Sequence, residues 1–271
     1  MTQTNEAVAQ TGQYRLANGL NIYYEEFGTG EPLILLHGGL GTGIGQWASQ
    51  IPILSPHFRI VMPDARAHGN TQNPTEEFSL QLLAADVVAL IGALNLDKPT
   101  ICGWSMGANT ALEIGLHYPD LAKALVMGGV LYRFSNAYLA SLKALGVEGP
   151  GQVNFEHTEK VNPQLIELVR SLHPQGPDYW KTLLTQISHE QYRPLPYSAD
   201  DYKKIGVPTL LLIGDRDQFI PVEETVELYR MIPNAELAVI PQADHAVARM
   251  KAELFADIVL DFLLRHGGQA K

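Results

Sequence analysis

The sequence predicts an α/β protein built on a mostly parallel sheet with helices on both faces. Short, continuous apolar runs such as Leu33–Leu36 are typical of strands that are covered on both sides. Segments in which apolar residues recur at helical spacing separate these runs, and strands that alternate with helices favour a parallel sheet. With 271 residues, of which 46% are hydrophobic and 18% charged, the chain is long enough to bury a sizeable core.

The elements are expected in this order. A strand at Leu20–Tyr24 follows the turn signal Asn18–Gly19, and Leu33–Leu36 is the next strand. Apolar runs predict further strands at 60–62, 100–102, 124–127, 209–213 and 237–240, and helical spacing predicts helices around 82–91, 108–116 and 254–263. Between about Tyr132 and Asp201 the pattern is helical only, divided by glycine and proline at 149–151, 174 and 176–177. We therefore expect an α/β core of residues 1–131 and 201–271, with a helical cap inserted as residues 132–200.

The charge balance excludes some partners. The chain carries 19 Lys and Arg against 29 Asp and Glu, a formal charge of −10, and such an acidic protein binds nucleic acid or anionic membrane poorly. Its one cysteine, Cys102, cannot form an internal disulfide, and Met1–Gln10 lacks the apolar core of a signal peptide. We expect a cytoplasmic protein with a small-molecule substrate and no nucleic-acid or membrane partner; the oligomeric state stays open.

A nucleophile motif lies between an expected strand and an expected helix. The run Gly103-Trp104-Ser105-Met106-Gly107 matches G-x-S-x-G, in which a serine sits on a sharp, strained turn. The residues two positions to each side would collide in such a turn if they had side chains, which explains the glycines. Ser105 is the predicted nucleophile; the alternative is a glycine-flanked turn with an incidental serine.

A serine nucleophile needs a base that a third group orients. His245 follows the last expected strand, and Asp217 follows the strand before it, as Ser105 follows an earlier one. The carboxyl ends of parallel strands share one edge of a sheet, where ligand sites form. We predict His245 as the general base and Asp217 as the acid that orients it, with Asp215 as the alternative acid.

The oxyanion of the reaction needs two N–H donors near the serine. The run His37-Gly38-Gly39-Leu40-Gly41 follows an expected strand, and its glycines allow the backbone to approach a substrate closely. The predicted donors are the backbone N–H groups of Met106 and Gly39, with Leu40 as the alternative to Gly39. The competing interpretation is a tight glycine turn that binds nothing.

In order and spacing, these motifs resemble the α/β-hydrolase superfamily, particularly its single-domain esterase, lactonase and haloperoxidase-like members, from about Leu20 to Leu264. The resemblance extends to Gly214-x-x-Asp217 with Pro221, which is similar to the family's acid segment, and to the loop at 64–69, which is similar to D-x-R-G-H-G with Ala67 at the first glycine. It implies hydrolysis of small esters or lactones, including acyl-homoserine lactones, beneath a cap. Asp244 stands where a glycine is usual, and we hypothesise that its charge raises the pKa of His245.

The cap is expected to cover an apolar pocket, since apolar walls favour an uncharged acyl group. The candidate substrate contacts are Leu40, Trp104, Tyr132, Phe134, Tyr138 and Trp180. Aromatic residues in helices are more often core residues, so only some of these are expected to touch substrate. The chemistry requires no cofactor, and the sequence has no H-E-x-x-H or paired-cysteine metal motif.

Other functions stay open at this point. The same triad supports C–C bond hydrolysis, cofactor-free perhydrolysis and thioester hydrolysis, and the same fold supports ligand binding without catalysis. Dehalogenase and epoxide hydrolase are disfavoured because those enzymes have an aspartate where Ser105 stands. Gly43–Ala48 approximates the dinucleotide motif G-x-G-x-x-A, with Asp64 as a ribose-binding acid, but its glycines begin seven residues after the strand ends, too late for that motif.

Overall fold

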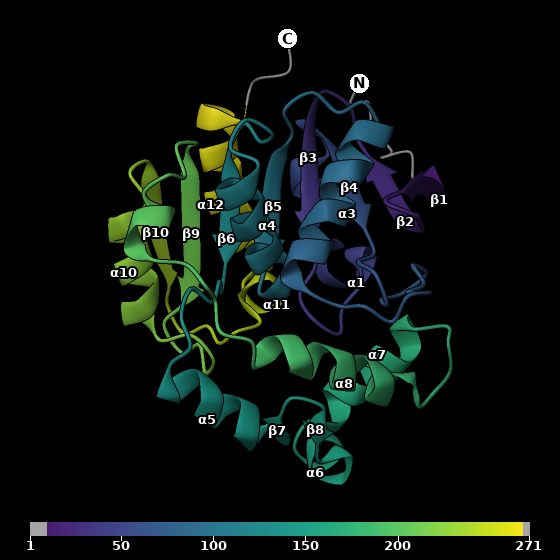
Figure 1. The fold of residues 1–271 in the computed structure, drawn as a ribbon. Coiled ribbons are helices and arrows are strands. Elements are labelled where there is room, and N and C mark those ends of the chain that lie inside the picture. Colours follow the sequence, from purple (N-terminus) through teal and green to yellow (C-terminus); the bar gives the residue numbers. More distant parts are fainter. Residues whose placement is uncertain (1–9, 268–271) are drawn as a thin grey trace.

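The computed structural model describes residues 10–267, and in this part of the chain an eight-stranded sheet runs through the middle of the molecule (Figure 1). The strand order is β1 (Gln10–Ala17), β2 (Leu20–Phe27), β4 (Phe58–Pro63), β3 (Glu31–Leu36), β5 (Thr100–Trp104), β6 (Leu125–Gly128), β9 (Thr209–Gly214) and β10 (Ala235–Ile240). Strands β1, β2 and β4 pair antiparallel, and from β4 to β10 all pairs are parallel. The predicted mostly parallel sheet is therefore confirmed.

Both faces of the sheet are covered, as the apolar runs predicted. In β3, Leu33 and Leu35 pack to one side with Trp47, while Ile34 and Leu36 pack to the other. The first side carries α1 (Gly43–Trp47), α2 (Ile51–Leu54), α11 (Val247–Met250) and α12 (Ala252–His266); the second carries α3 (Leu80–Ala93), α4 (Met106–His117), α9 (Ala199–Tyr202) and α10 (Val222–Met231). Burial on both faces explains why these strands are continuously apolar.

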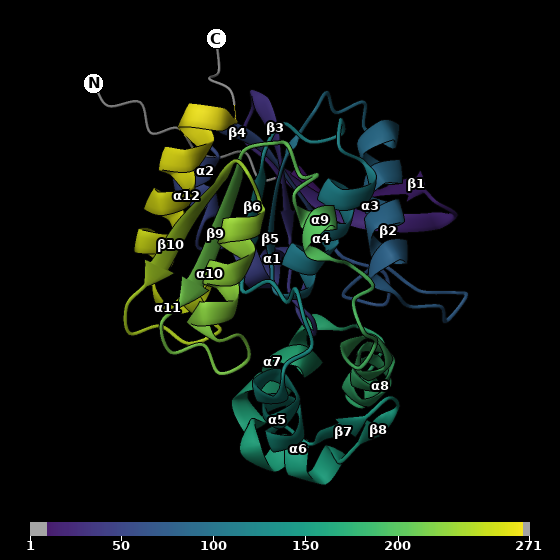
Figure 2. The same ribbon diagram turned by 60° about the vertical axis from the view of Figure 1, so that its left-hand side comes forward.

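The inserted segment forms a separate layer beyond one edge of the sheet (Figures 1 and 2). It contains α5 (Asn136–Ala144), β7 (Val147–Gly149), β8 (Gln152–Val153), α6 (Phe155–Val161), α7 (Pro163–Leu172) and α8 (Tyr179–Gln191). The sequence predicted only helices here, and the β7–β8 hairpin is a difference. The breaker run at 149–151 makes its turn, in which Gly151 has a φ of +70° that favours glycine.

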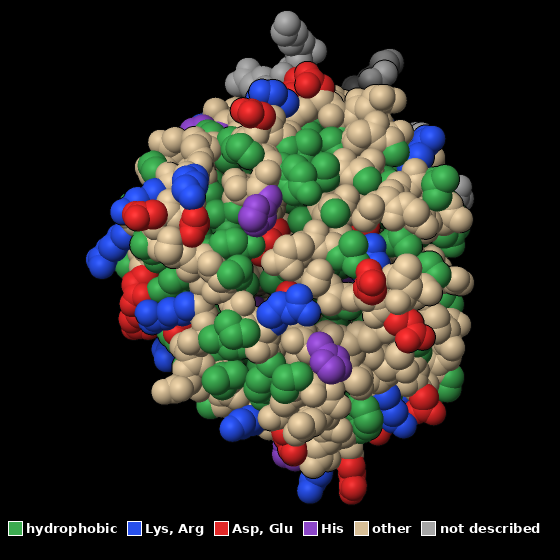
Figure 3. Space-filling model, viewed as in Figure 1, with side chains coloured by type: hydrophobic (Ala, Val, Ile, Leu, Met, Phe, Trp, Pro, Cys, Tyr) green, Lys and Arg blue, Asp and Glu red, His purple; other side chains and the backbone are tan. Residues whose placement is uncertain are grey.

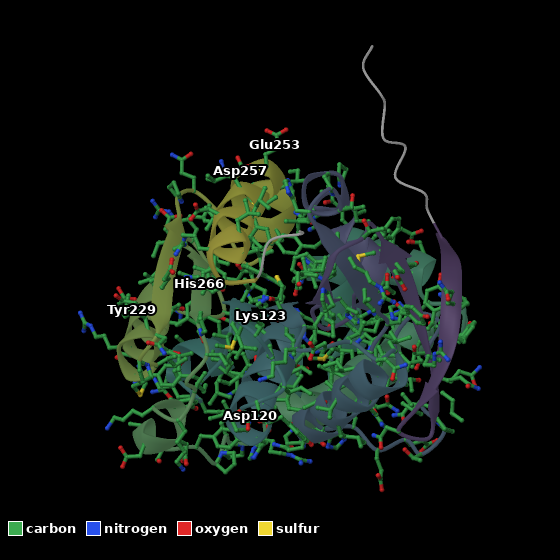
Figure 4. The ribbon with its side chains drawn as sticks, turned by 90° about the horizontal axis from the view of Figure 1, so that it is seen from above. Asp120, Lys123, Tyr229, Glu253, Asp257 and His266 are labelled. Atoms are coloured by element: carbon green, nitrogen blue, oxygen red, sulfur yellow. The ribbon has the colours of Figure 1, made fainter. Side chains whose placement is uncertain are left out.

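Basic and acidic side chains lie interspersed on the face in Figure 3. Figure 4 looks onto the end of the sheet remote from the inserted layer, where Lys123 lies 3.3 Å from Glu31 and His266 lies 3.0 Å from Glu236. Within residues 10–267, no helix has the length and apolar character needed to cross a bilayer.

Candidate active site

The serine motif forms the turn from β5 into α4. Ser105 lies between these elements with φ 54° and ψ −118°, a strained conformation for a residue other than glycine. A Cβ atom built on Gly103 would lie 2.1 Å from the carbonyl oxygen of Gly107, and one built on Gly107 would lie 2.2 Å from the carbonyl oxygen of Leu36. Only glycine fits at both positions, as the sequence predicted.

Asp217 and His245 meet at the carboxyl edge of the sheet. The Nδ1 atom of His245 lies 2.7 Å from Oδ2 of Asp217, in the loop that follows β9. The other oxygen, Oδ1, accepts hydrogen bonds from the backbone N–H groups of Phe219, at 2.8 Å, and Ile220, at 3.0 Å. The Asp217 side chain is fully buried, so this carboxylate holds the imidazole with Nδ1 protonated and leaves Nε2 as the basic nitrogen.

The alternative acid has different partners. Oδ1 of Asp215 accepts the backbone N–H of Ala243 at 3.3 Å, and its other oxygen lies 3.6 Å from Arg216. Asp244 likewise accepts the N–H of Ala246, at 2.7 Å, in the turn that begins α11. Asp217 is thus the carboxylate that contacts the imidazole of His245, and the effect of Asp244 on that imidazole stays a hypothesis.

Ser105 and His245 line the same cavity. Between these two described residues the structure has no direct hydrogen bond. Catalytic hydrogen bonds of this kind are often long without substrate and tighten in the complex. The structure therefore brings the three predicted residues to one site, with the bond from Asp217 to His245 already formed.

The glycine loop after β3 lies against Ser105. A Cβ on Gly38 would lie 3.4 Å from Cβ of Ser105, and a Cβ on Gly39 would lie 4.0 Å from Sδ of Met106. The backbone N–H of Leu40 donates to Nε2 of His68 at 3.3 Å. Because Leu40 already has this partner, Gly39 is the better placed of the two candidate donors.

Two buried histidines support this loop. Nδ1 of His37 donates to the carbonyl of Gly38 at 2.7 Å, and Nε2 accepts the N–H of Ala65 at 2.9 Å. In His68, Nδ1 donates to the carbonyl of Arg66 at 2.9 Å. Burial lowers the pKa of His37 and lowers that of His68 well below its usual value, so both rings are neutral and act as fixed donors and acceptors.

The loop at 64–69 is likewise structural. Asp64 accepts the backbone N–H groups of Gly43 and Asn70, each at 2.9 Å. Both oxygens of its carboxylate thus accept backbone N–H groups, so Asp64 is not placed to bind the ribose of a dinucleotide. Arg66 forms a buried, two-pronged ion pair with Asp86 at 2.6 and 2.7 Å.

A cavity of about 440 Å³ lies between the inserted layer and the sheet. Of the predicted substrate contacts, Leu40, Trp104, Phe134 and Tyr138 line it. Tyr132 and Trp180, the other two predicted contacts, do not line this cavity. Tyr132 packs on Tyr202 and its hydroxyl donates to the partly exposed Glu227 of α10, whereas Trp180 packs on Phe155 inside the inserted layer.

Sequence reasoning missed several lining residues. They include Leu131, Leu184, Ile187 and Phe219, together with the polar Asn109, Gln218, Glu190 and Arg249. Phe219 packs edge-on against His245 with ring centroids 4.8 Å apart, and its place two residues after the acid was the available signal. Ile187 lies in α8 and is buried. No group of three metal-ligating side chains occurs in the part of the chain that the structure describes.

Known proteins share this architecture. A sequence model of the alpha/beta hydrolase family matches residues 33–258. The 2-hydroxy-6-oxo-6-(2'-aminophenyl)hexa-2,4-dienoic acid hydrolase of Metapseudomonas resinovorans is 28% identical, covering 92% of this chain and 89% of its own. The 3-oxoadipate enol-lactonase 2 of Acinetobacter baylyi is 22% identical, covering 84% and 88%.

Solved structures agree on the fold. The meta-cleavage product hydrolase CumD of Pseudomonas fluorescens IP01 superposes with a TM-score of 0.78 over 94% of this chain and 97% of its own, at 22% identity. The family model spans most of the chain, including the serine turn and the acid. The chain therefore belongs to the alpha/beta hydrolase family.

Proposed function

We propose that this protein is a serine hydrolase that cleaves carboxylic esters or lactones through an acyl-enzyme on Ser105. The observation that carries the proposal is the 2.7 Å contact between Asp217 and His245 at the cavity that Ser105 also lines. A buried carboxylate on Nδ1 leaves Nε2 free to take the serine proton and stabilises the imidazolium that forms. This is the arrangement that acyl transfer requires.

In the first half-reaction, Oγ of Ser105 attacks the substrate carbonyl while Nε2 of His245 accepts its proton. The carbonyl oxygen becomes an oxyanion, and the backbone N–H groups of Met106 and Gly39 stabilise it. The tetrahedral intermediate then collapses, the bond to the leaving oxygen breaks, and His245 returns the proton to that oxygen. An alcohol leaves if the substrate is an ester; a lactone opens and keeps its hydroxyl.

In the second half-reaction, water attacks the acyl-enzyme and gives a proton to His245. Collapse releases the acid and returns the proton to Oγ of Ser105. The mostly apolar walls beside the serine, among them Leu40, Phe134 and Ile187, favour an uncharged acyl group. The cavity volume of about 440 Å³ is within the range of pockets that enclose small organic ligands.

The test is steady-state hydrolysis of p-nitrophenyl esters and of lactones over a series of acyl chain lengths. Wild-type protein is expected to turn over, and Ser105→Ala to lose activity by about a thousandfold or more, because the nucleophile is gone. Ser171→Ala, at an exposed position on α7, is the matched control and is expected to retain activity. Intact-mass detection of an acyl group on wild-type but not on Ser105→Ala would establish the intermediate. Full activity in Ser105→Ala would refute the proposal.

C–C bond hydrolysis is the second candidate, and the dienoic acid hydrolase from Metapseudomonas resinovorans favours it at 28% identity. The same serine, base and oxyanion donors would act on a ketone carbonyl, with a carbon as the leaving atom. Parallel assays with a 2-hydroxy-6-oxohexa-2,4-dienoate and with the ester series compare kcat/KM directly. We expect the esters or lactones to have the higher value; a higher value for the dienoate would assign the protein to the second candidate.

A further inference from the structure

The indole of Trp104 connects the strand of the nucleophile to the loop of the base. Its Nε1–H donates to the backbone carbonyl of His245 at 2.8 Å. The side chain is buried, with the residue 3% exposed, so water does not compete for this bond. Trp104 immediately precedes Ser105, so the two ends of the bond lie on the segments that carry the proposed nucleophile and base.

Two glycines make the space for this contact. A Cβ on Gly128 would lie 2.0 Å from Cζ3 of Trp104, and a Cβ on Gly129 would lie 2.8 Å from Cε1 of His245. Phe255 of α12 packs edge-on against the indole, with ring centroids 5.7 Å apart. The ring is held on several sides, so the N–H is fixed in its direction toward the His245 loop.

The other two tryptophans show that this hydrogen bond is specific to position 104. The Nε1 atoms of Trp47 and Trp180 are buried and have no hydrogen-bond partner. Trp47 packs against the same Phe255, at 5.9 Å between centroids. The molecule thus contains a second buried indole with the same neighbour and without the bond, which serves as an internal comparison.

The other hydrogen bonds of His245 come from a single segment. Asp217 holds its Nδ1, and the side chain of Gln218 accepts its backbone N–H at 3.3 Å. Both lie in the loop after β9, so they orient His245 relative to that loop and not relative to Ser105. Among the hydrogen bonds described for His245, the one from Trp104 is the bond that reaches β5.

We propose that Trp104 is a positioning residue: its N–H holds the backbone of His245 at the distance from Ser105 that proton transfer requires. The inference rests on the proposed serine-hydrolase function. A displacement of about 1 Å between reacting groups costs about a hundredfold in rate, so one well-placed tether has a measurable effect.

The test is Trp104→Phe, which keeps a buried aromatic ring and removes the donor. We expect kcat for p-nitrophenyl butyrate to fall by about tenfold to a hundredfold, with KM within about twofold, because the tether acts on the chemical step. Trp47→Phe is the matched control: it makes the same change beside the same Phe255 and is expected to keep kcat within about twofold. Thermal unfolding of both variants measures the packing loss that they share.

The outcomes separate the two proposals. Equal kcat losses in Trp104→Phe and Trp47→Phe would show that only packing matters, and a KM increase at unchanged kcat would show that Trp104 contacts substrate; either overturns the positioning role. Activity that survives Ser105→Ala overturns the proposed function itself.

A second variant applies if Trp104→Phe does not fold. In a Trp47→Phe/Trp180→Phe background, β-(3-benzothienyl)alanine incorporated in place of tryptophan keeps the indole shape at position 104 without the N–H. The same fall in kcat is expected there, and unchanged kcat refutes the role.

Discussion

Gly103 and Gly107 meet across the serine turn so closely that a Cβ on the first would lie 2.1 Å from the carbonyl oxygen of the second. No real Cβ is found so near a backbone oxygen, and the atoms on both sides belong to regular elements that cannot move independently. The strained conformation of Ser105 therefore depends on the absence of two side chains.

The first prediction concerns these glycines. Gly107→Ala is expected to lower the free energy of unfolding by about 1–3 kcal/mol, because the new methyl group would overlap the carbonyl of Leu36. Gly92→Ala in α3, where a Cβ meets nothing within 4 Å, is the control and is expected to be neutral or to stabilise by up to about 1 kcal/mol. Urea unfolding measures both; equal stability of the two variants would contradict the close contact.

The second prediction concerns the acid. Asp217→Asn is expected to lower kcat for ester hydrolysis by about 10³–10⁴, because the amide N–H would face Nδ1 and favour the wrong imidazole tautomer. Asp215→Asn removes a neighbouring carboxylate that does not contact His245 and is expected to lower kcat by less than about tenfold. A similar loss in both variants would show that the contact with His245 is not what matters.

The third prediction concerns the buried histidines His37, His68 and His173. Burial lowers the pKa of each, so the unfolded chain takes up protons near pH 6.5 that the folded protein does not. Their contribution to stability is therefore complete above pH 6.5 and decreases as the pH falls below it. Urea unfolding from pH 8 to pH 5 is expected to show this decrease, and His173→Gln to make it shallower. The same substitution at the exposed His189 is the control, and an equal change in slope there would contradict the prediction.

The fourth prediction concerns Glu25 in β2. Burial, reinforced by the charge of Asp64, raises the pKa of its carboxyl to about 7. The folded state therefore holds a proton that the unfolded chain loses near pH 4.5, and stability decreases as the pH rises from 4.5 to about 7. Glu25→Gln is expected to raise Tm more at pH 8 than at pH 5.

The adjacent residue provides the control for this prediction. Glu26 forms an ion pair with Arg59 at 2.6 Å, so Glu26→Gln is expected to lower Tm at pH 8. The two substitutions lie at adjacent positions and are expected to change Tm at pH 8 in opposite directions. A Tm increase for Glu25→Gln of the same size at both pH values would show that the charge of this carboxyl is not responsible.

The sequence predicted the parts of the molecule that short segments determine. The serine turn brings Gly103 and Gly107 into contact within five residues, and the pattern at 103–107 was sufficient to predict it, although the second glycine also faces the carbonyl of Leu36 in β3. The continuous apolar strands predicted the two covered faces for the same local reason. For the acid, the sequence predicted Asp217 with Asp215 as the alternative, and the course of the loop after β9 shows that Asp217 is the carboxylate that reaches His245.

The cavity lining could not be predicted in the same way. Tyr132 and Trp180 are aromatic residues near the expected pocket, but their directions depend on partners elsewhere in the chain, such as Tyr202 and Phe155. The bond from Trp104 to His245 joins residues 141 positions apart, and no pattern around position 104 indicates it. Long-range packing decides these contacts.

The cavity lies between the inserted layer and the sheet, and its walls come from both. If the proposed function holds, a bound acyl chain fills this cavity and makes apolar contacts with both parts at once. A ligand in the cavity therefore stabilises the packing of the inserted layer against the sheet. The protein is therefore expected to have a higher unfolding temperature with the cavity occupied than with it empty. The difference is expected to grow with the length of the bound acyl chain.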